Sequence, residues 1–305
     1  MKILLATQKP FSAAAVNRLK KLAGTTEHEL VLLEKYKEQS DLENAVKDAD
    51  ALIVRSDKVT AGVVSAATAL KIVVRAGAGY DNVDLQSCSD RKIVVMNTPG
   101  QNSNAVAELS LGLMIYLARN TFLPGTGSEL KGKKLGIHAF GNVGKLVASM
   151  AKGFGMEVSA FDPFVDDRIL LDDGVIPLKS INELYSLNDI ISINIPAMPA
   201  TVKSINKSVF DSMKENVILV NTARKEVIDE IDLLNAMSNR QGMKYGTDVM
   251  PECHEKMKEF GTRYFATPKK MGAETEEANV NAAIAALNQI IDFFATGNEK
   301  FRVNK

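Results

Sequence analysis

The chain of 305 residues has no tryptophan, two cysteines and three histidines. Cys88 and Cys253 cannot build a disulfide framework, and His28, His138 and His254 show no spacing typical of a zinc site, so no metal is expected. The 37 basic residues balance the 37 acidic ones, which gives no sign of a nucleic acid or a membrane surface as partner. This composition fits a reduced, cytoplasmic setting.

Long apolar runs are also absent. The first apolar run is broken by Gln8, Lys9 and Pro10, so it is too short for a secretion signal. No stretch of about 18 uncharged apolar residues, the length needed to cross a membrane, occurs anywhere in the sequence. The sequence therefore predicts a soluble protein.

Short runs of strand type alternate with segments of helical spacing along the whole chain. Strands are predicted at residues 3–6, 30–33, 51–54, 72–74, 94–96, 135–139, 158–161, 190–195, 217–221, 243–246 and 265–267. Helices are predicted at 12–22, 42–49, 63–67 and 276–295, and Ser180 with Glu183 marks another helix start. This alternation predicts α/β architecture, with parallel sheets that carry helices on both faces. We expect one domain from residues 1–98 with 274–305 and another from 99–273.

Residues 135–162 form the most informative stretch, a predicted strand, turn, helix and strand that ends at Asp162. The turn has Gly141 and Gly144 in the second and third positions of the dinucleotide fingerprint G-x-G-x-x-G. Ala139 takes the place of the first glycine, which costs little provided that the turn keeps a negative φ there. The unpaired amides at the helix start suit a pyrophosphate, and Asp162 suits a ribose 2′-hydroxyl while repelling a 2′-phosphate. The cofactor predicted is NAD rather than NADP.

Further candidates follow other predicted strands, because an open α/β sheet binds ligands beyond the carboxyl ends of its strands. They are Arg224, Asp248, Lys269 and the run Gly77, Ala78 and Gly79. Each alone would be an ordinary loop charge or turn glycine, but all of them lie at strand ends.

Several ordered blocks carry a resemblance to a known family. They are VRSDKVT at 54–60, RAGAGYDNVD at 75–84, NTPGQN at 97–102, VAE at 106–108, the fingerprint, NTAR at 221–224 and TDV at 247–249. On these residues the chain resembles the D-2-hydroxyacid dehydrogenases, and within them most closely the 3-phosphoglycerate dehydrogenases. The resemblance implies a Rossmann NAD-binding domain inserted into a flavodoxin-like substrate domain. The chain ends without the regulatory domain of longer relatives, so feedback through such a domain is not expected.

The resemblance implies a role for each matching position. Arg224 would orient the 2-oxygen and carboxylate of the substrate, a task that suits a guanidinium fork. The amides of Ala78 and Gly79 would hold the carboxylate, with Asn102 nearby and Ala78 also beside the cofactor. The residues that would take a substrate phosphate are Arg55, Ser56 and Lys58.

The implied cofactor contacts lie around the fingerprint and at later strand ends. Gly141, Gly144 and the amides of Asn142 and Val143 would meet the pyrophosphate, and Asp162 the adenosine ribose. Ile195 and Pro196 match the positions that lie beside the adenine of the cofactor in this family. The positions near the nicotinamide are Thr222, Ala223 and Asp248.

The chain departs from the family at the acid/base. The family's usual histidine after Thr-Pro is replaced by Lys269, and Lys270 stands one residue further on. A lysine accepts the hydroxyl proton when its amine is neutral, which the nearby positive charge of Arg224 and the oxidised nicotinamide favours. The identity of the glutamate that supports this acid/base stays open, because Glu252 stands four residues after Asp248, whereas the family pattern places its glutamate five residues after this aspartate. His254 is the rival acid/base if this loop folds inward.

The resemblance implies NAD-dependent oxidation of 3-phospho-D-glycerate to 3-phosphohydroxypyruvate, the first step of phosphorylated L-serine biosynthesis. One alternative is a glyoxylate or hydroxypyruvate reductase, or another D-2-hydroxyacid dehydrogenase, on the same scaffold. Another is a non-catalytic partner protein that senses NAD. By analogy with the family, the helical segment from Ala105 to Arg119 predicts a homodimer.

Overall fold

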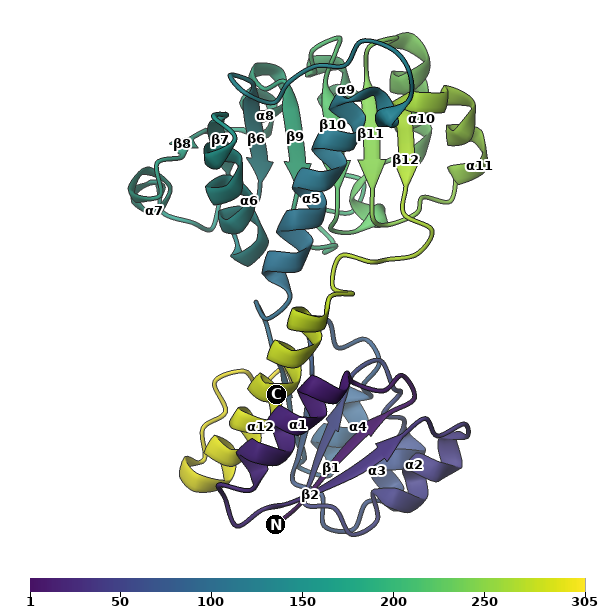
Figure 1. The fold of residues 1–305 in the computed structure, drawn as a ribbon, viewed down its shortest axis with the longest axis vertical. Coiled ribbons are helices and arrows are strands. Elements are labelled where there is room, and N and C mark those ends of the chain that lie inside the picture. Colours follow the sequence, from purple (N-terminus) through teal and green to yellow (C-terminus); the bar gives the residue numbers. More distant parts are fainter. Residues whose placement is uncertain (305) are drawn as a thin grey trace. The chain divides into compact units, whose positions relative to one another are not determined.

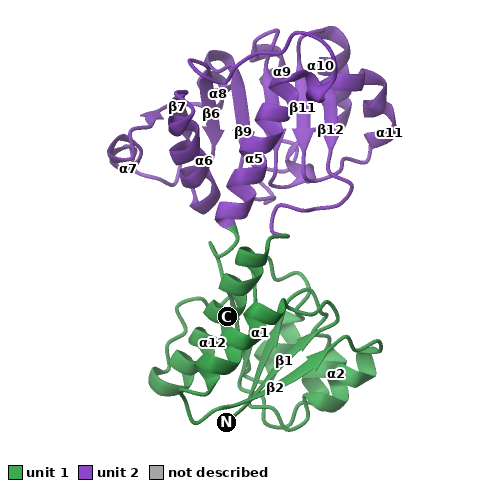
Figure 2. Cartoon of the chain, in the orientation of Figure 1, with its two compact units in different colours: residues 1–102, 274–305 green, residues 103–273 purple. Residues whose placement is uncertain are grey.

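A computed structural model describes residues 1–304 and contains two compact units. Unit 1 comprises Met1–Asn102 and Glu274–Lys305, and unit 2 comprises Ser103–Ala273 (Figure 2). The second boundary coincides with the one expected from the sequence, and the first lies four residues later than expected. The chain therefore leaves unit 1 once and returns to it once.

Unit 1 is built on a parallel sheet of five strands in the order β2-β1-β3-β4-β5. The strands are β1 (Lys2–Thr7), β2 (Glu29–Glu34), β3 (Ala51–Val54), β4 (Ile72–Arg75) and β5 (Val94–Asn97). This is the flavodoxin-like order, whose topological switch point lies between the first and third strands. Ligands are expected beyond the carboxyl ends of β1 and β3.

Helices cover both faces of this sheet, as expected (Figure 1). They are α1 (Ala13–Ala23), α2 (Gln39–Ala45), α3 (Ala61–Ala66), α4 (Leu85–Asp90) and α12 (Glu276–Thr296). Alternate residues of β1 enter opposite cores: Ile3 and Leu5 pack with α1 and α12, whereas Leu4 and Ala6 pack on the side of α2 and α3. Because both faces are buried, the strands are apolar throughout. The last helix thus returns to unit 1.

Helix α2 begins three residues earlier than expected. The carboxylate of Asp41 accepts a 3.1 Å hydrogen bond from the Glu38 amide, and the Glu38 side chain in turn caps the Asp41 amide. This reciprocal capping box satisfies amides that the first turn leaves unpaired. The helix starts where its cap lies, ahead of the first apolar residue Leu42.

Unit 2 has a parallel sheet of seven strands in the order β12-β11-β10-β9-β6-β7-β8. The strands are β6 (Lys134–His138), β7 (Glu157–Phe161), β8 (Ile176–Pro177), β9 (Ile190–Ile193), β10 (Ile218–Asn221), β11 (Lys244–Thr247) and β12 (Tyr264–Ala266). This is the dinucleotide-binding order, which reverses between β6 and β9. The sequence did not predict the two-residue strand β8, and β9 ends two residues earlier than expected.

Two further cores lie on the two faces of this sheet. The helices are α5 (Ser103–Ala118), α6 (Asn142–Gly153), α7 (Asp167–Asp172), α8 (Ile181–Leu187), α9 (Lys207–Ser212), α10 (Glu230–Asn239) and α11 (His254–Met257). Short 3₁₀ turns occupy Asn120–Phe122, Lys225–Val227 and Lys258–Arg263. Ser180 caps α8 by accepting the Glu183 amide at 3.1 Å, as its spacing predicted. Among residues 1–304, no helix is long and apolar enough to span a membrane.

Candidate active site

The turn after β6 points the start of α6 at the switch point of the unit 2 sheet. Gly141 precedes the first helical residue, and Asn142 and Val143 begin the helix. The first amides of a helix have no acceptor within it, and the helix dipole adds positive potential at the same place. The turn therefore provides an anion site where the strand order reverses, which is the position of a dinucleotide pyrophosphate.

The two glycines of this turn serve different purposes. A Cβ added to Gly144 would lie 2.3 Å from the carbonyl oxygen of Ala139, so only glycine lets α6 pack this close to its strand. Apart from its chain neighbours, no atom of the described residues would lie within 4 Å of a Cβ added to Gly141, and the φ of −83° suits any residue. Gly141 is thus not required by the protein, and its open space fits a ligand that approaches the backbone.

Ala139 differs from the expectation. Its φ is +78°, in the left-handed region that favours glycine. The condition under which alanine would cost little in place of the first glycine is therefore not met. The turn keeps the geometry of the fingerprint although the residue at its first position is strained.

Asp162 lies at the end of β7 with its carboxylate turned to the turn after β6. Oδ2 accepts the Phe140 amide at 2.8 Å and Oδ1 accepts the Phe164 amide at 2.9 Å. A carboxylate has about four acceptor positions, so about two remain for ribose hydroxyls. The open Gly141, the unpaired amides and this carboxylate fit NAD, which supplies the hydride acceptor in oxidation.

The ends of β6 and β9 are tied together at the switch point. The backbone amide of Asn194 donates to the carbonyl oxygen of His138 at 2.9 Å, and Ile195 beyond it is buried in the core. Pro196 is exposed and its carbonyl oxygen accepts the Thr201 hydroxyl. Within residues 1–304, Asn194 Oδ1 is buried without a hydrogen-bond partner, so this end of the sheet has an acceptor to offer.

His138 is a core residue of unit 2. It is buried, and its Nδ1 lies 3.0 Å from the hydroxyl of Tyr185, which is also buried. Burial lowers the pKa of His138 to about 4. The imidazole is therefore neutral at physiological pH and serves packing.

The turn after β10 holds Arg224 in place. Asn221 accepts the Ala223 amide at 2.9 Å and donates to the Arg224 carbonyl oxygen at 3.0 Å. The Thr222 hydroxyl lies 2.9 Å from that of Ser110 on α5, which fixes the turn from the other side. The guanidinium of Arg224 donates to the Ala223 carbonyl oxygen through Nη1, which leaves its other donors for a ligand.

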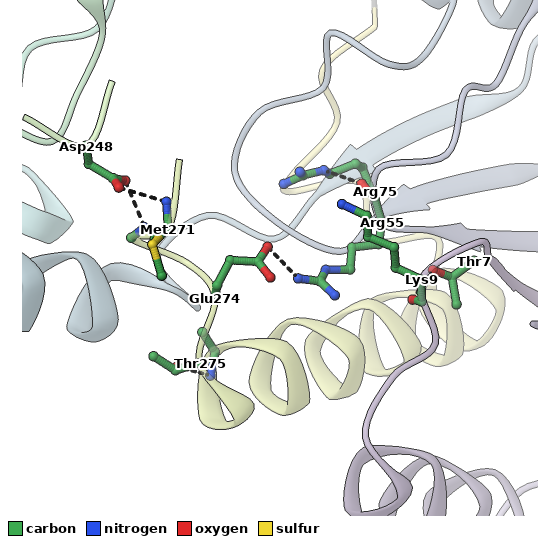
Figure 3. A network of polar contacts seen from close by, with 10 residues as sticks. Thr7, Lys9, Arg55, Arg75, Asp248, Met271, Glu274 and Thr275 are labelled. Atoms are coloured by element: carbon green, nitrogen blue, oxygen red, sulfur yellow. Dashed lines mark hydrogen bonds and ion pairs between the residues drawn. The ribbon is translucent and has the colours of Figure 1, made fainter. Parts of the chain in front are cut away.

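Asp248, at the end of β11, is 1% exposed and holds the loop that carries the two lysines. Its carboxylate accepts the Thr267 hydroxyl at 2.8 Å and the amides of Met271 and Gly272 at 2.7 and 2.8 Å (Figure 3 shows the two amide bonds). Three of about four acceptor positions are thus filled, and one remains for a carboxamide. Lys269 and Lys270 are exposed between these anchors.

The acidic and imidazole candidates of the next loop have partners of their own. Glu252 is exposed and forms a 3.1 Å ion pair with Lys225, the residue after Arg224. His254 begins α11, and its Nδ1 lies 2.8 Å from the hydroxyl of Tyr264 with the rings in edge contact. That Glu252 supports Lys269 stays a prediction. The contact with Tyr264 gives His254 a packing role.

In unit 1 the switch point brings the ends of β1 and β3 together. Asp57, which is 4% exposed, accepts the Gln8 amide at 2.7 Å and the Tyr36 hydroxyl at 2.8 Å, and the Arg55 amide lies 3.4 Å from its Oδ2. This buried carboxylate fixes the backbone of the loop that carries Arg55, Ser56 and Lys58. The sequence did not reveal this role, because Asp57 resembles an ordinary loop aspartate.

The loop after β4 offers backbone amides. Gly77 has φ +146°, and a Cβ there would lie 1.7 Å from Nη1 of Arg75, so this position requires glycine. Asn97 donates to the Ala78 carbonyl oxygen at 2.7 Å, which holds the loop against the end of β5. Ala78 is exposed, Gly79 is half-buried, and Asn102 is half-buried at the end of unit 1. This arrangement leaves the amides of residues 78 and 79 suited to a carboxylate.

Comparisons with known proteins agree with this geometry. Residues 117–271, about half of the chain, match the family model described as D-isomer specific 2-hydroxyacid dehydrogenase, NAD binding domain. A D-3-phosphoglycerate dehydrogenase of Methanocaldococcus jannaschii is 36% identical over 83% of this chain, which spans only 51% of that relative. A hydroxypyruvate reductase of Thermotoga maritima is 35% identical over 86% of this chain and 90% of its own length.

Solved structures show the same fold. An NAD⁺-bound 3-phosphoglycerate dehydrogenase of Entamoeba histolytica is 46% identical, with a TM-score of 0.88 over 100% of this chain and 99% of that one. A D-lactate dehydrogenase of Escherichia coli, 23% identical, shares the fold with a TM-score of 0.82 over 99% of this chain and 100% of its own. The chain therefore belongs to the D-isomer specific 2-hydroxyacid dehydrogenase family and is an NAD-dependent oxidoreductase.

Proposed function

We propose that this chain oxidises 3-phospho-D-glycerate to 3-phosphohydroxypyruvate, the entry step of phosphorylated L-serine biosynthesis, in the cytoplasm. The carrying observation is Arg55, which follows β3 at the switch point of unit 1 and whose side chain is only 15% exposed. A guanidinium held at such a point can bind a phosphate through two parallel hydrogen bonds. The names of the Methanocaldococcus and Entamoeba relatives support the same substrate.

In the proposed reaction Arg224 orients the substrate's carboxylate and 2-oxygen, and the amides of Ala78 and Gly79 hold the carboxylate. Lys269 accepts the hydroxyl proton, while Asp248 keeps its loop in place. Oxidation should accelerate from pH 6 to 9, because only the neutral amine accepts a proton. A flat profile with chemistry rate-limiting would contradict a lysine base.

The test is an NADH absorbance assay with 3-phosphoglycerate, glycerate and lactate, and in reverse with hydroxypyruvate. We expect Arg55→Ala to raise KM for 3-phosphoglycerate at least tenfold, an effect of about 1.4 kcal/mol typical of a charge-assisted hydrogen bond. KM for hydroxypyruvate should stay near its wild-type value. Equal effects on both substrates would contradict a phosphate role for Arg55.

A reductase of hydroxypyruvate or glyoxylate is the second candidate, favoured by the Thermotoga relative that this chain matches over 90% of its length. It predicts similar kcat/KM for phosphorylated and unphosphorylated substrates. The base is assigned by variants: Lys269→Ala should abolish turnover, whereas Lys270→Ala and His254→Ala should retain it. Loss of turnover in Lys270→Ala but not in Lys269→Ala would assign the role of base to Lys270.

We further propose a homodimer formed by α5 and the residues after it. The large apolar side chains of Phe122 and Leu123 are 68% and 56% exposed directly after this helix. Exposed apolar patches of this kind mark protein contacts. Light scattering should give twice the chain's mass of 33.1 kDa, and Phe122→Asp should reduce it.

A further inference from the structure

The guanidinium of Arg55 already holds an anion. Its Nη2 lies 3.0 Å from Oε1 of Glu274 (Figure 3). The two residues are 219 positions apart in sequence but belong to the same unit. The carboxylate therefore lies where the proposed function requires the substrate phosphate to bind.

The two partners differ in how firmly they are held. The Arg55 carbonyl oxygen accepts Nε of Arg75 at 2.9 Å, and Asp57 orders the loop around it. The Glu274 side chain is 41% exposed, against 15% for Arg55. Glu274 directly precedes Thr275, the residue that caps α12. An exchange of anions at this site would therefore move the glutamate and leave the arginine in place.

The charges favour such an exchange only for a strong anion. A phosphate monoester carries a charge of about −1.5 to −2 and three acceptor oxygens, so it engages the guanidinium more strongly than one carboxylate oxygen does. An ion pair in which one partner is 41% exposed is weak and can be displaced. A free anion with a single charge, however, competes with a carboxylate that is tethered at high effective concentration.

We propose that Glu274 competes with the substrate phosphate for Arg55, so that the ion pair must open before a phosphorylated substrate binds. This inference rests on the proposed function and adds a competition step to it. Any anion that binds Arg55 must displace Glu274, whereas an unphosphorylated substrate leaves the ion pair intact. Glu274 thus weakens the binding of phosphorylated substrates alone and limits how strongly the site prefers them.

The test measures inorganic phosphate binding by calorimetry, which needs no turnover. Glu274→Gln should bind phosphate about two- to fivefold more tightly, the range expected when one exposed ion pair is removed. Glu274→Asp, which keeps the charge, should stay closer to wild type. The matched control Glu276→Gln removes the same charge from an exposed position at the start of α12 and should bind phosphate as wild type does.

Turnover gives a second readout. In Glu274→Gln, KM for 3-phosphoglycerate should fall by a similar factor at unchanged kcat, and kcat/KM for glycerate should not change. Unchanged or weaker phosphate binding in Glu274→Gln, or tighter binding in Glu276→Gln as well, would overturn the inference. If Arg55→Ala raises KM for 3-phosphoglycerate but Glu274→Gln has no effect, only this inference fails. If Arg55→Ala does not distinguish the substrates, the proposed function fails.

Discussion

The carboxylate of Asp248 accepts a 2.8 Å hydrogen bond from the hydroxyl of Thr267, two residues before Lys269. The same carboxylate accepts the amides of Met271 and Gly272 on the far side of the lysines. One buried side chain thus fixes both ends of a loop that contributes no strand or helix. The position of the proposed base depends on this carboxylate as much as on the lysine itself.

Replacing Asp248 by asparagine should therefore impair turnover. An amide nitrogen cannot accept, so at least one of the three bonds is lost, at a cost of about 1 to 3 kcal/mol for a buried group left unpaired. We expect kcat to fall at least tenfold, together with a lower free energy of unfolding in urea. Thr267→Val, which removes one bond to the loop, should lower kcat less. Wild-type kcat in Asp248→Asn would contradict this account.

The two glycines of the cofactor turn give a matched pair of variants. Gly141→Ala adds a methyl group that, apart from its chain neighbours, has no atom of residues 1–304 within 4 Å. We therefore expect unchanged stability and NADH binding weakened at least tenfold, or about 1.4 kcal/mol. Gly144→Ala places a Cβ 2.3 Å from the Ala139 carbonyl oxygen, so we expect about 1 to 3 kcal/mol lower stability.

Thermal unfolding without cofactor and NADH fluorescence titration measure these two effects, and the chain's lack of tryptophan keeps the fluorescence background low. Gly141→Ala would contradict the assignment if it destabilised the free protein as much as Gly144→Ala does.

The strand ends could be predicted because parallel strands buried on both faces are apolar, and such runs are legible in sequence. Arg224, Asp248 and the fingerprint were singled out as candidates in this way. The pairing of Arg55 with Glu274 could not, because the two lie 219 positions apart and Glu274 precedes a helix instead of following a strand. The strand β8 was missed because two residues, Ile176 and Pro177, carry no periodicity.

The backbone conformation at Ala139 could not be predicted from the sequence either, because the identity of a residue does not reveal its φ. Its left-handed conformation costs about 1 to 2 kcal/mol for a residue with a Cβ. Ala139→Gly relieves this strain but raises the entropy of the unfolded chain, so we expect a net gain of about 0.5 to 1 kcal/mol in urea unfolding.

The matched control is Ala14→Gly at an exposed position of helix α1, where the same substitution should lower stability by about 1 kcal/mol. A loss of stability in Ala139→Gly of the same size as in Ala14→Gly would show that the turn is not strained at this residue.

The buried His138 makes the stability of unit 2 depend on pH. Its pKa is lowered to about 4 by burial, against about 6.5 in the unfolded chain, so the unfolded state binds more protons between these values. Stability from this residue is therefore complete above pH 6.5 and is lost as the pH falls toward 4, by up to about 3 kcal/mol. His138→Gln should reduce the slope of unfolding free energy against pH in this window, although it costs stability at pH 7.5 by disturbing the contact with Tyr185. Urea unfolding followed by circular dichroism at several pH values measures both slopes, and an equally steep slope in His138→Gln would assign the pH dependence to other groups.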